Sequence, residues 1–182
     1  MVRYFRLERS VRFIFLCARN YSEATKMAAI IRNYRPEDWP DLEDIILNAE
    51  NFGPEFLQHG KLTVDVFTEN PEFGTVLVAE DPRSHDVVGF AAVQYGWRAL
   101  VIESIVVHHR HLRTGVGREL VEHIKKLGAE HPGADVLRVD TGDFMDYAQR
   151  FYESCGFEVG GCVSHYLSWH NDQIIYVLRL KE

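Results

Sequence analysis

Residues 106–120 read Val106-Val107-His108-His109-Arg110-His111-Leu112-Arg113-Thr114-Gly115-Val116-Gly117-Arg118-Glu119-Leu120. An apolar run ends, a basic loop follows, and two glycines precede a pattern with helical spacing. This order predicts a strand, a tight turn and the N-terminus of a helix. The first amides of a helix carry partial positive charge and attract phosphate oxygens, and glycine lets a ligand approach the backbone closely. The stretch therefore predicts a cradle for a pyrophosphate.

Two common phosphate-binding motifs do not fit this loop. The dinucleotide motif G-x-G-x-x-G needs a third glycine or alanine, and Leu120 stands at that position. The P-loop needs a Lys-Ser or Lys-Thr pair after its last glycine, and none follows here. The loop is therefore expected to bind a phosphate-bearing ligand in a way that differs from both of these motifs.

A second motif lies downstream, where residues 148–157 read Ala-Gln-Arg-Phe-Tyr-Glu-Ser-Cys-Gly-Phe. This stretch resembles the A-x-x-x-Y-x-x-x-G-F signature of the GNAT superfamily of acyl-CoA-dependent N-acetyltransferases. The glycine loop is similar to the superfamily's [QR]-x-x-G-x-[GA] element, read here as residues 112–117. Leu112 departs from the usual Gln or Arg. Both motifs stand in the order and at the separation that the superfamily has, and the resemblance covers about residues 30–180.

The resemblance implies that the co-substrate is acetyl-CoA. Its pantetheine arm is expected to pair with the end of strand 99–107, which the superfamily separates from the strand expected at 136–141. A backbone N–H near Val107 is the usual oxyanion donor, and one such donor contributes about 3 kcal/mol. The implied cofactor-binding residues are Ile105, Val106, Val107, Leu112, Arg113, Thr114, Gly115, Val116, Gly117, Arg118 and Tyr152.

The catalytic candidates are Tyr152 and Glu103. Tyr152 occupies the superfamily's tyrosine position, where a phenol can return a proton to the departing thiolate; the alternative is a tyrosine that only packs against the cofactor. Glu103 is a carboxylate in an apolar strand, which is costly unless it faces a cleft or a partner. By the two-residue period we place it on the same face as Ile105 and Val107, as a general base.

Other roles for these carboxylates stay open at this point. Asp140 and Asp143, which belong to the second separated strand and to the segment after it, are alternative bases. Any of the three could instead bind a cationic substrate or form a salt bridge, and a water chain to bulk could deprotonate the amine without a dedicated base.

The composition and charge of the chain argue against some classes of function. A net charge of −7 argues against nucleic-acid binding. The first 28 residues carry six basic side chains against two acidic ones, which superficially resembles a transit peptide. Their apolar run, residues 13–16, is too short to span a membrane. We interpret residues 1–28 as an extension that is poorly ordered or not native, with Met27 as an alternative start.

Cysteine and histidine usage predicts neither a disulfide framework nor a metal centre. Three cysteines without metal or redox spacing indicate reduced thiols and a cytoplasmic location. The histidines at 108, 109 and 111 lie in a connecting loop with no carboxylate or cysteine following at ligand spacing, so we expect no metal there.

The periodicities predict one α/β domain over residues 29–182, with a mixed, mostly antiparallel sheet of about seven strands and about four flanking helices. A turn is expected at Gly160-Gly161, and the last two strands could pair across a homodimer. The predicted strands are 29–34, 75–80, 87–95, 99–107, 136–141, 162–169 and 173–180, and the predicted helices are 36–49, 55–69, 116–129 and 146–154.

Together these observations predict an N-acetyltransferase that moves an acetyl group from acetyl-CoA to a primary amine by direct attack. The acceptor could be a small-molecule amine or a peptide amine, and the acidic composition slightly favours a cation. The alternative is a non-catalytic acyl-CoA-binding or regulatory module on the same fold, which would keep the glycine loop but not need Tyr152.

Overall fold

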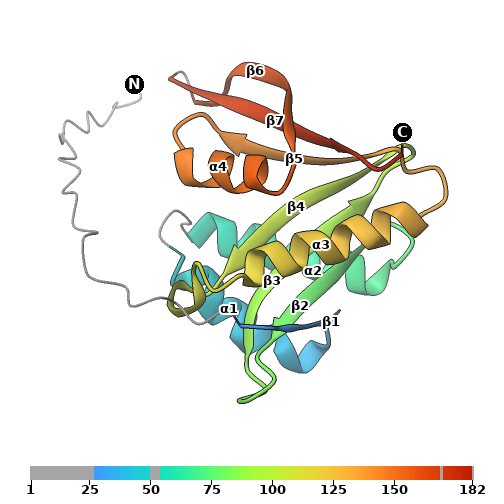
Figure 1. Ribbon diagram of the computed structural model, residues 1–182. Coiled ribbons are helices and arrows are strands. Elements are labelled where there is room, and N and C mark those ends of the chain that lie inside the picture. The colour runs from blue at the N-terminus through green and yellow to red at the C-terminus, as the bar shows by residue number, and fades with distance from the viewer. Residues whose placement is uncertain (1–26, 50–53, 169, 182) are drawn as a thin grey trace, which may run out of the picture.

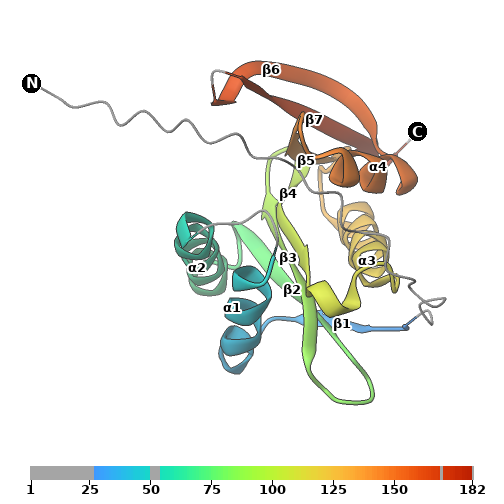
Figure 2. The same cartoon turned by 90° about the vertical axis from the view of Figure 1, so that its left-hand side faces the viewer.

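The computed structural model describes residues 27–49, 54–168 and 170–181 of the 182-residue chain. Within them, seven strands form one sheet in the order β1-β2-β3-β4-β5-β7-β6. Helices α3 and α4 cover one face of the sheet, and α1 and α2 cover the other (Figures 1 and 2). This arrangement confirms the predicted α/β domain with a mixed, mostly antiparallel sheet. Residues 1–26 of the expected extension lie outside the described residues.

The helices and strands follow the predicted order, with small changes at their ends. Two short 3-10 turns, η1 (Pro36–Asp38) and η2 (His109–His111), precede α1 and α3. The strands are β1 (Ile30–Asn33), β2 (Gly74–Glu80), β3 (Val87–Tyr95), β4 (Ala99–Val107), β5 (Val136–Gly142), β6 (Glu158–Ser168) and β7 (Asn171–Arg179), and the helices are α1 (Trp39–Leu47), α2 (Pro54–Glu69), α3 (Val116–Glu130) and α4 (Asp146–Ser154).

Each face of the sheet buries its own apolar cluster. Leu120, Val121 and Ile124 of α3 and Ala148 and Tyr152 of α4 pack against one face. The other cluster joins α1 and α2 to β2, β3 and the end of β4. Because β2 and β3 are covered on both sides, most of their residues are buried. Among the described residues, no helix combines the length and hydrophobicity needed to cross a bilayer.

The turn predicted at Gly160-Gly161 is wrong. These glycines lie inside β6, which already begins at Glu158. The pairing register with β7 shifts between Val159 and Gly161, so the glycine pair forms an irregularity within the strand. A Cβ at Gly160 would lie 2.9 Å from both methyl groups of Val177, so the absence of a side chain permits close packing on β7.

The central feature of the sheet is the short contact between β4 and β5. These strands are parallel and pair only from Ala99 to Ile102 on β4 and from Val136 to Val139 on β5. Every other neighbouring pair of strands is antiparallel. Beyond Ile102 and Val139 the two strands move apart (Figure 1). The sequence-based expectation that these two strands separate is therefore confirmed.

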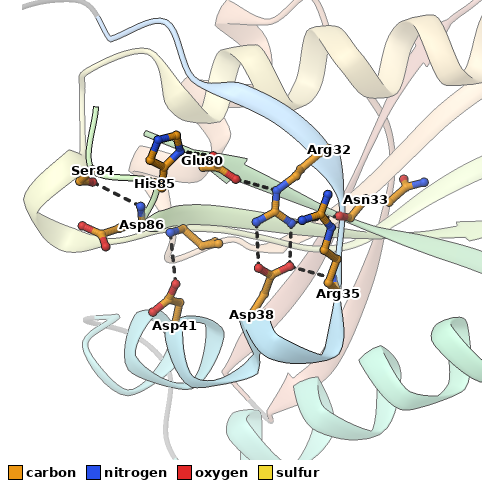
Figure 3. Close-up of polar contacts among 10 residues, drawn as sticks. Arg32, Asn33, Arg35, Asp38, Asp41, Glu80, Ser84, His85 and Asp86 are labelled. Carbon is orange, nitrogen blue, oxygen red and sulfur yellow. Dashed lines mark hydrogen bonds and ion pairs between the residues drawn. The ribbon is translucent and has the colours of Figure 1, made fainter. Parts of the chain in front are cut away.

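A charged network fixes the far edge of the sheet to the start of α1 (Figure 3). The Arg32 guanidinium on β1 donates two hydrogen bonds of 2.8 Å to the Asp38 carboxylate of η1. Arg32 Nε also donates to Glu80 on β2, at 2.7 Å. The Asp38 carboxylate accepts a third bond from the Arg35 amide, at 2.7 Å. This network holds β1, β2 and η1 together at a point where Asp38 is buried.

The network makes the edge of the sheet sensitive to acid. Burial by itself would raise the pKa of Asp38, but the hydrogen bonds from Arg32 and from the Arg35 amide outweigh it, and the pKa lies below its ordinary value. A carboxyl whose pKa is lowered on folding adds stability above its unfolded pKa of about 3.9 and loses it as the pH falls through the folded value.

We expect Asp38→Asn to lower the free energy of unfolding at pH 7 by about 2 kcal/mol, because the charged hydrogen bonds from Arg32 are lost. Below about pH 4 the difference from wild type should shrink, since the Asp38 carboxyl of the unfolded chain becomes protonated there while the folded one, with its lowered pKa, takes up its proton only at lower pH. Urea unfolding at pH 7 and pH 3.5 measures both values. Glu72→Gln, at an exposed carboxylate, is the matched control; a gap that stays constant with pH would contradict the assignment.

Candidate functional site

The separation of β4 from β5 leaves backbone groups facing a gap. His108 N donates to Val88 O on β3 at 2.9 Å, which fixes the alternation of the β3–β4 ladder. By that alternation, Ile105 and Val107 direct their N–H and C=O groups away from β3, towards β5. The described residues provide no strand partner for that stretch of β4. The gap therefore offers an extended ligand the hydrogen bonds of a missing strand.

A β-bulge at Glu103 changes which side of the sheet its side chain reaches. Ala92 of β3 pairs with Ser104 and the next residue, Val93, pairs with Ile102, so Glu103 is the extra residue. Leu100 and Ile102 pack in the cluster under α3, and so do Ile105 and Val107. The odd-even alternation thus reverses at the bulge. The prediction that Glu103 shares a face with Ile105 and Val107 is wrong, because the inserted residue shifts the phase by one.

Glu103 instead lines an open polar pocket of about 280 Å³. Arg138 on β5 makes a bidentate pair with Asp140, with hydrogen bonds of 2.9 and 2.7 Å. Gln173 Nε2 on β7 also donates to Asp140, at 2.9 Å. The hydrogen bond to Asp140 raises the pKa of Arg138, so the guanidinium stays charged. The other lining residues are Gln94, Val101 and Ile102.

The carboxylates in and beside this pocket are therefore not equivalent. Asp140 is occupied by Arg138 and Gln173. Glu103 is exposed to solvent and lies close enough to Arg138 to interact with its charge. Asp143, the third candidate base, is exposed and does not line the pocket. Sequence reasoning missed Arg138 and Gln173, although an Arg two residues before Asp140 on a strand places both side chains on one face.

The glycine loop adopts the conformation that an anion cradle needs. Gly115 is the N-cap of α3 with φ of 103°, and no side chain caps this N-terminus. Arg113 also has positive φ, at 64°. Alternating left-handed residues turn successive amides towards one point, which favours an anion. The side chain of Val116 is fully buried, so only its backbone can contact a ligand there.

The loop residues predicted to bind a cofactor divide into two groups. Leu112 and Arg113 are exposed, whereas Arg118 donates to Ser154 O and Oγ on α4, both at 3.0 Å. At Gly117 a Cβ would lie 3.2 Å from Phe151 of α4 and 3.6 Å from Val107 of β4. Gly117 and Arg118 therefore also hold the start of α3 against α4.

Tyr152 lies on α4 and packs among aromatic rings. Its ring centroid is 5.3 Å from that of Phe151, 5.8 Å from Phe157 and 6.0 Å from Tyr176. Only 6% of Tyr152 is exposed. Burial, more than the nearby acidic groups, raises the pKa of Tyr152 well above its ordinary value. The phenol is thus held in its protonated form, which a proton donor requires.

The histidines that follow β4 form a small aromatic group. His108 lies 4.3 Å from His109 and 5.9 Å from His111, measured between ring centroids. Throughout the part of the chain that the structure describes, no group of three or more His, Cys, Asp or Glu side chains is arranged to hold a metal ion.

The family described as "Acetyltransferase (GNAT) family" has a sequence model that matches residues 25–157. Among curated proteins, none matches the chain in sequence. Solved structures match its fold closely.

One similar structure is an acetyltransferase of the GNAT family from Desulfovibrio desulfuricans, 21% identical with a TM-score of 0.74, covering 85% of this chain and 100% of that one. A second is the ribosomal-protein-S18-alanine N-acetyltransferase from Escherichia coli, 20% identical with a TM-score of 0.70, covering 85% and 96%. A third is an aminoglycoside 6′-N-acetyltransferase complexed with coenzyme A, 19% identical with a TM-score of 0.67, covering 84% and 98%. At these sequence identities the three structures show that the chain shares their fold, and they show nothing beyond it.

We expect Gly115→Ala to weaken coenzyme A binding and to lower the free energy of unfolding by about 1 kcal/mol, because a Cβ disfavours the left-handed conformation. Isothermal titration calorimetry and urea unfolding measure the two effects. Gly161→Ala is the matched control, since its Cβ would make ordinary contact with Ile175 at 3.8 Å. Equal coenzyme affinity in Gly115→Ala and wild type would exclude the cradle.

Proposed function

Because this chain belongs to the acetyltransferase (GNAT) family of acetyl-CoA-dependent N-acyltransferases, we propose that it moves an acetyl group from acetyl-CoA to a primary amine by direct attack in a ternary complex. The observation that carries this proposal is the gap between β4 and β5. The gap lies between the candidate pyrophosphate cradle and the polar pocket, so one donor molecule could reach from the first to the second.

In this proposal, backbone groups make most of the contacts with the acetyl donor. The amides at the start of α3 hold the pyrophosphate, and the unpaired groups of Ile105 and Val107 pair with the amide groups of the pantetheine arm. The N–H of Ile105 lies at the end of that row next to the polar pocket, where it can stabilise the tetrahedral oxyanion; the Val107 N–H expected from the resemblance lies nearer the cradle. Pre-positioned donors of this kind need no rearrangement during the reaction.

The acceptor amine is proposed to bind in the polar pocket. Arg138 and Asp140 neutralise one another, so Glu103 gives the pocket a net negative charge. An ammonium group with a pKa near 10 must lose a proton before it can attack. Glu103 is the best-placed base, because Asp140 is held by Arg138 and Gln173. The pocket's polar lining fits a small cationic amine, and a peptide amine is the second acceptor class.

Tyr152 is proposed as the general acid. When the tetrahedral intermediate collapses, the bond from carbon to sulfur breaks and the thiolate of coenzyme A leaves. The Tyr152 hydroxyl donates its proton to that sulfur and is restored from solvent. Its raised pKa keeps it protonated at the start of each cycle.

A non-catalytic acyl-CoA-binding module is the alternative, and the burial of Tyr152 favours it. A side chain that is only 6% exposed and surrounded by aromatic rings could serve packing alone. In that case acetyl-CoA would bind without turnover on any amine.

Two further proposals concern assembly and location. β6 is the outer strand of the sheet and exposes Val159, Val163 and Tyr166, which suits pairing between two copies of the chain. The described cysteines, Cys155 and Cys162, are both free thiols, which suits the reducing cytoplasm.

We expect Tyr152→Phe to lower kcat by about 100-fold while leaving the affinity for coenzyme A within about twofold of wild type, because only the proton donor is removed. Thiol release with a panel of amines measures kcat, and calorimetry measures binding. Tyr176→Phe is the matched control, as Tyr176 lies in the same cluster and its hydroxyl bonds Glu153 at 3.1 Å. Full activity in Tyr152→Phe would support the packing role instead.

Glu103→Gln should lower kcat/KM for the amine by about 100-fold with little change in KM for acetyl-CoA, since a general base is lost. If Glu103 acts as the base, the rise of kcat/KM with pH that is expected of wild type should change shape in the variant. If Glu103 only binds the cation, KM for the amine should rise and the pH profile should keep its shape. Asp143→Asn, outside the pocket, provides the comparison.

A further inference from the structure

His108 follows β4 directly and has a side chain that is only 13% exposed. Its Nδ1 accepts a hydrogen bond from the Arg110 amide at 3.3 Å. Its Nε2 lies 3.3 Å from Asp44 Oδ2 on α1. Because the Arg110 amide can only donate, Nδ1 must carry no proton, and the proton of the neutral ring lies on Nε2, facing Asp44. Both ring nitrogens are therefore engaged, so His108 is not free to act as a base.

The contact through Nδ1 lies at the head of the glycine loop. His108 is the N-cap of η2, and its carbonyl accepts from His111 N at 2.8 Å. His111 O in turn accepts from Thr114 Oγ1 at 2.6 Å. The next residue, Gly115, is the N-cap of α3. A short series of hydrogen bonds thus runs from the His108 ring to the first turn of the helix that forms the cradle.

The contact through Nε2 joins this loop to the other face of the sheet. Asp44 lies on α1, and its second carboxylate oxygen, Oδ1, accepts from Asn48 Nδ2 at 2.9 Å. His108 therefore connects two parts of the molecule. One is α1, which with α2 covers the face of the sheet that also carries the polar pocket. The other is the loop beside the coenzyme gap. Nothing in the proposed chemistry uses His108, yet its hydrogen bonds lie in the loop that leads into the candidate cradle.

We propose that His108, as a neutral ring, is a positioning residue for coenzyme binding: through Nδ1 it caps η2 and so fixes the course of the loop into α3, while its Nε2 faces Asp44 of α1. This inference rests on the proposed function, because it concerns the same coenzyme site. His108 does not touch the ligand; it holds the loop whose amides do.

Protonation of His108 would undo the arrangement. A proton on Nδ1 would face the Arg110 amide, so two donors would oppose one another. Burial lowers the pKa of His108 below its ordinary value, helped by His109, His111 and Arg110, whereas Asp44 acts in the opposite direction. Above the ordinary value of about 6.5 the ring is therefore neutral and the loop is held. Coenzyme affinity should fall as the pH drops through the lowered pKa of His108, which lies below that ordinary value.

Three substitutions separate the two contacts of the ring. Asn keeps an acceptor near the position of Nδ1 and is a good capping residue. Gln places its amide near the position of Nε2, and Leu keeps the volume but neither contact. At pH 7.5 we expect His108→Asn to bind coenzyme A within about twofold of wild type, and His108→Gln and His108→Leu to bind about three- to tenfold more weakly, as for a lost hydrogen bond.

Titration calorimetry with coenzyme A at pH 7.5 and pH 5.5 gives a second comparison. The phosphate groups of the ligand titrate equally with every variant, so their effect cancels between proteins. Wild type should lose more affinity between the two pH values than His108→Asn, which has no ring to protonate. His59→Asn, at an exposed histidine of α2, is the control and should keep the wild-type pH dependence.

The proposal is overturned if His108→Leu binds within twofold of wild type, if His108→Asn is as weak as His108→Leu, or if wild type and His108→Asn share one pH dependence. Hydrogen exchange of the Arg110 amide tests the cap without any ligand: it should quicken in His108→Leu and not in His108→Asn. If wild type itself fails to bind coenzyme A, the proposed function fails, and this inference with it. If wild type binds coenzyme A and the variants bind it equally well, this inference fails and the proposed function stands.

Discussion

The rest of the structure depends on the early end of the β4–β5 pairing. Parallel neighbours in the middle of a sheet normally satisfy each other's backbone groups along their whole length, and buried amides without partners are costly. Here the pairing stops at Ile102 and Val139, in the middle of the sheet. The residues of the unpaired row on β4, Ile105 and Val107, are only partly buried, and in the proposed function an extended ligand completes the row. The bulge at Glu103 lies where the separation begins and places a carboxylate at the edge of the gap.

The two helices beside the gap are fixed to each other as well as to the sheet. Gly117 allows Phe151 and Val107 to approach the first turn of α3, and Arg118 bonds the end of α4 through Ser154. A donor held at the start of α3 therefore has a defined relation to the aromatic cluster around Tyr152. This rigidity matters for group transfer, because a small misplacement of the reacting atoms costs much of the rate.

Charge is distributed to match these roles. In the polar pocket, Arg138 binds Asp140, and Glu103 is exposed to solvent, where the proposed function assigns it a cationic amine. At the far edge, Arg32 is bound by two carboxylates and serves stability (Figure 3). The same residue types thus line the candidate site in one place and form a structural link in the other; what differs is whether every carboxylate is already paired with an arginine.

The sequence by itself determined the order of elements, the glycine loop before α3 and the position of Tyr152, because these depend on local patterns: apolar periodicity, turn residues and two short motifs. It also identified which two strands separate, through resemblance to the family. It did not determine the face that Glu103 occupies, because a bulge depends on the register of two strands and leaves no mark in the alternation of residue types. Nor did it reveal the bulge at Gly160, the pairing of Arg138 with Asp140 and Gln173, or the contact of His108 with Asp44. Those contacts join residues up to 64 positions apart, and only the packing of the tertiary structure decides which of them meet.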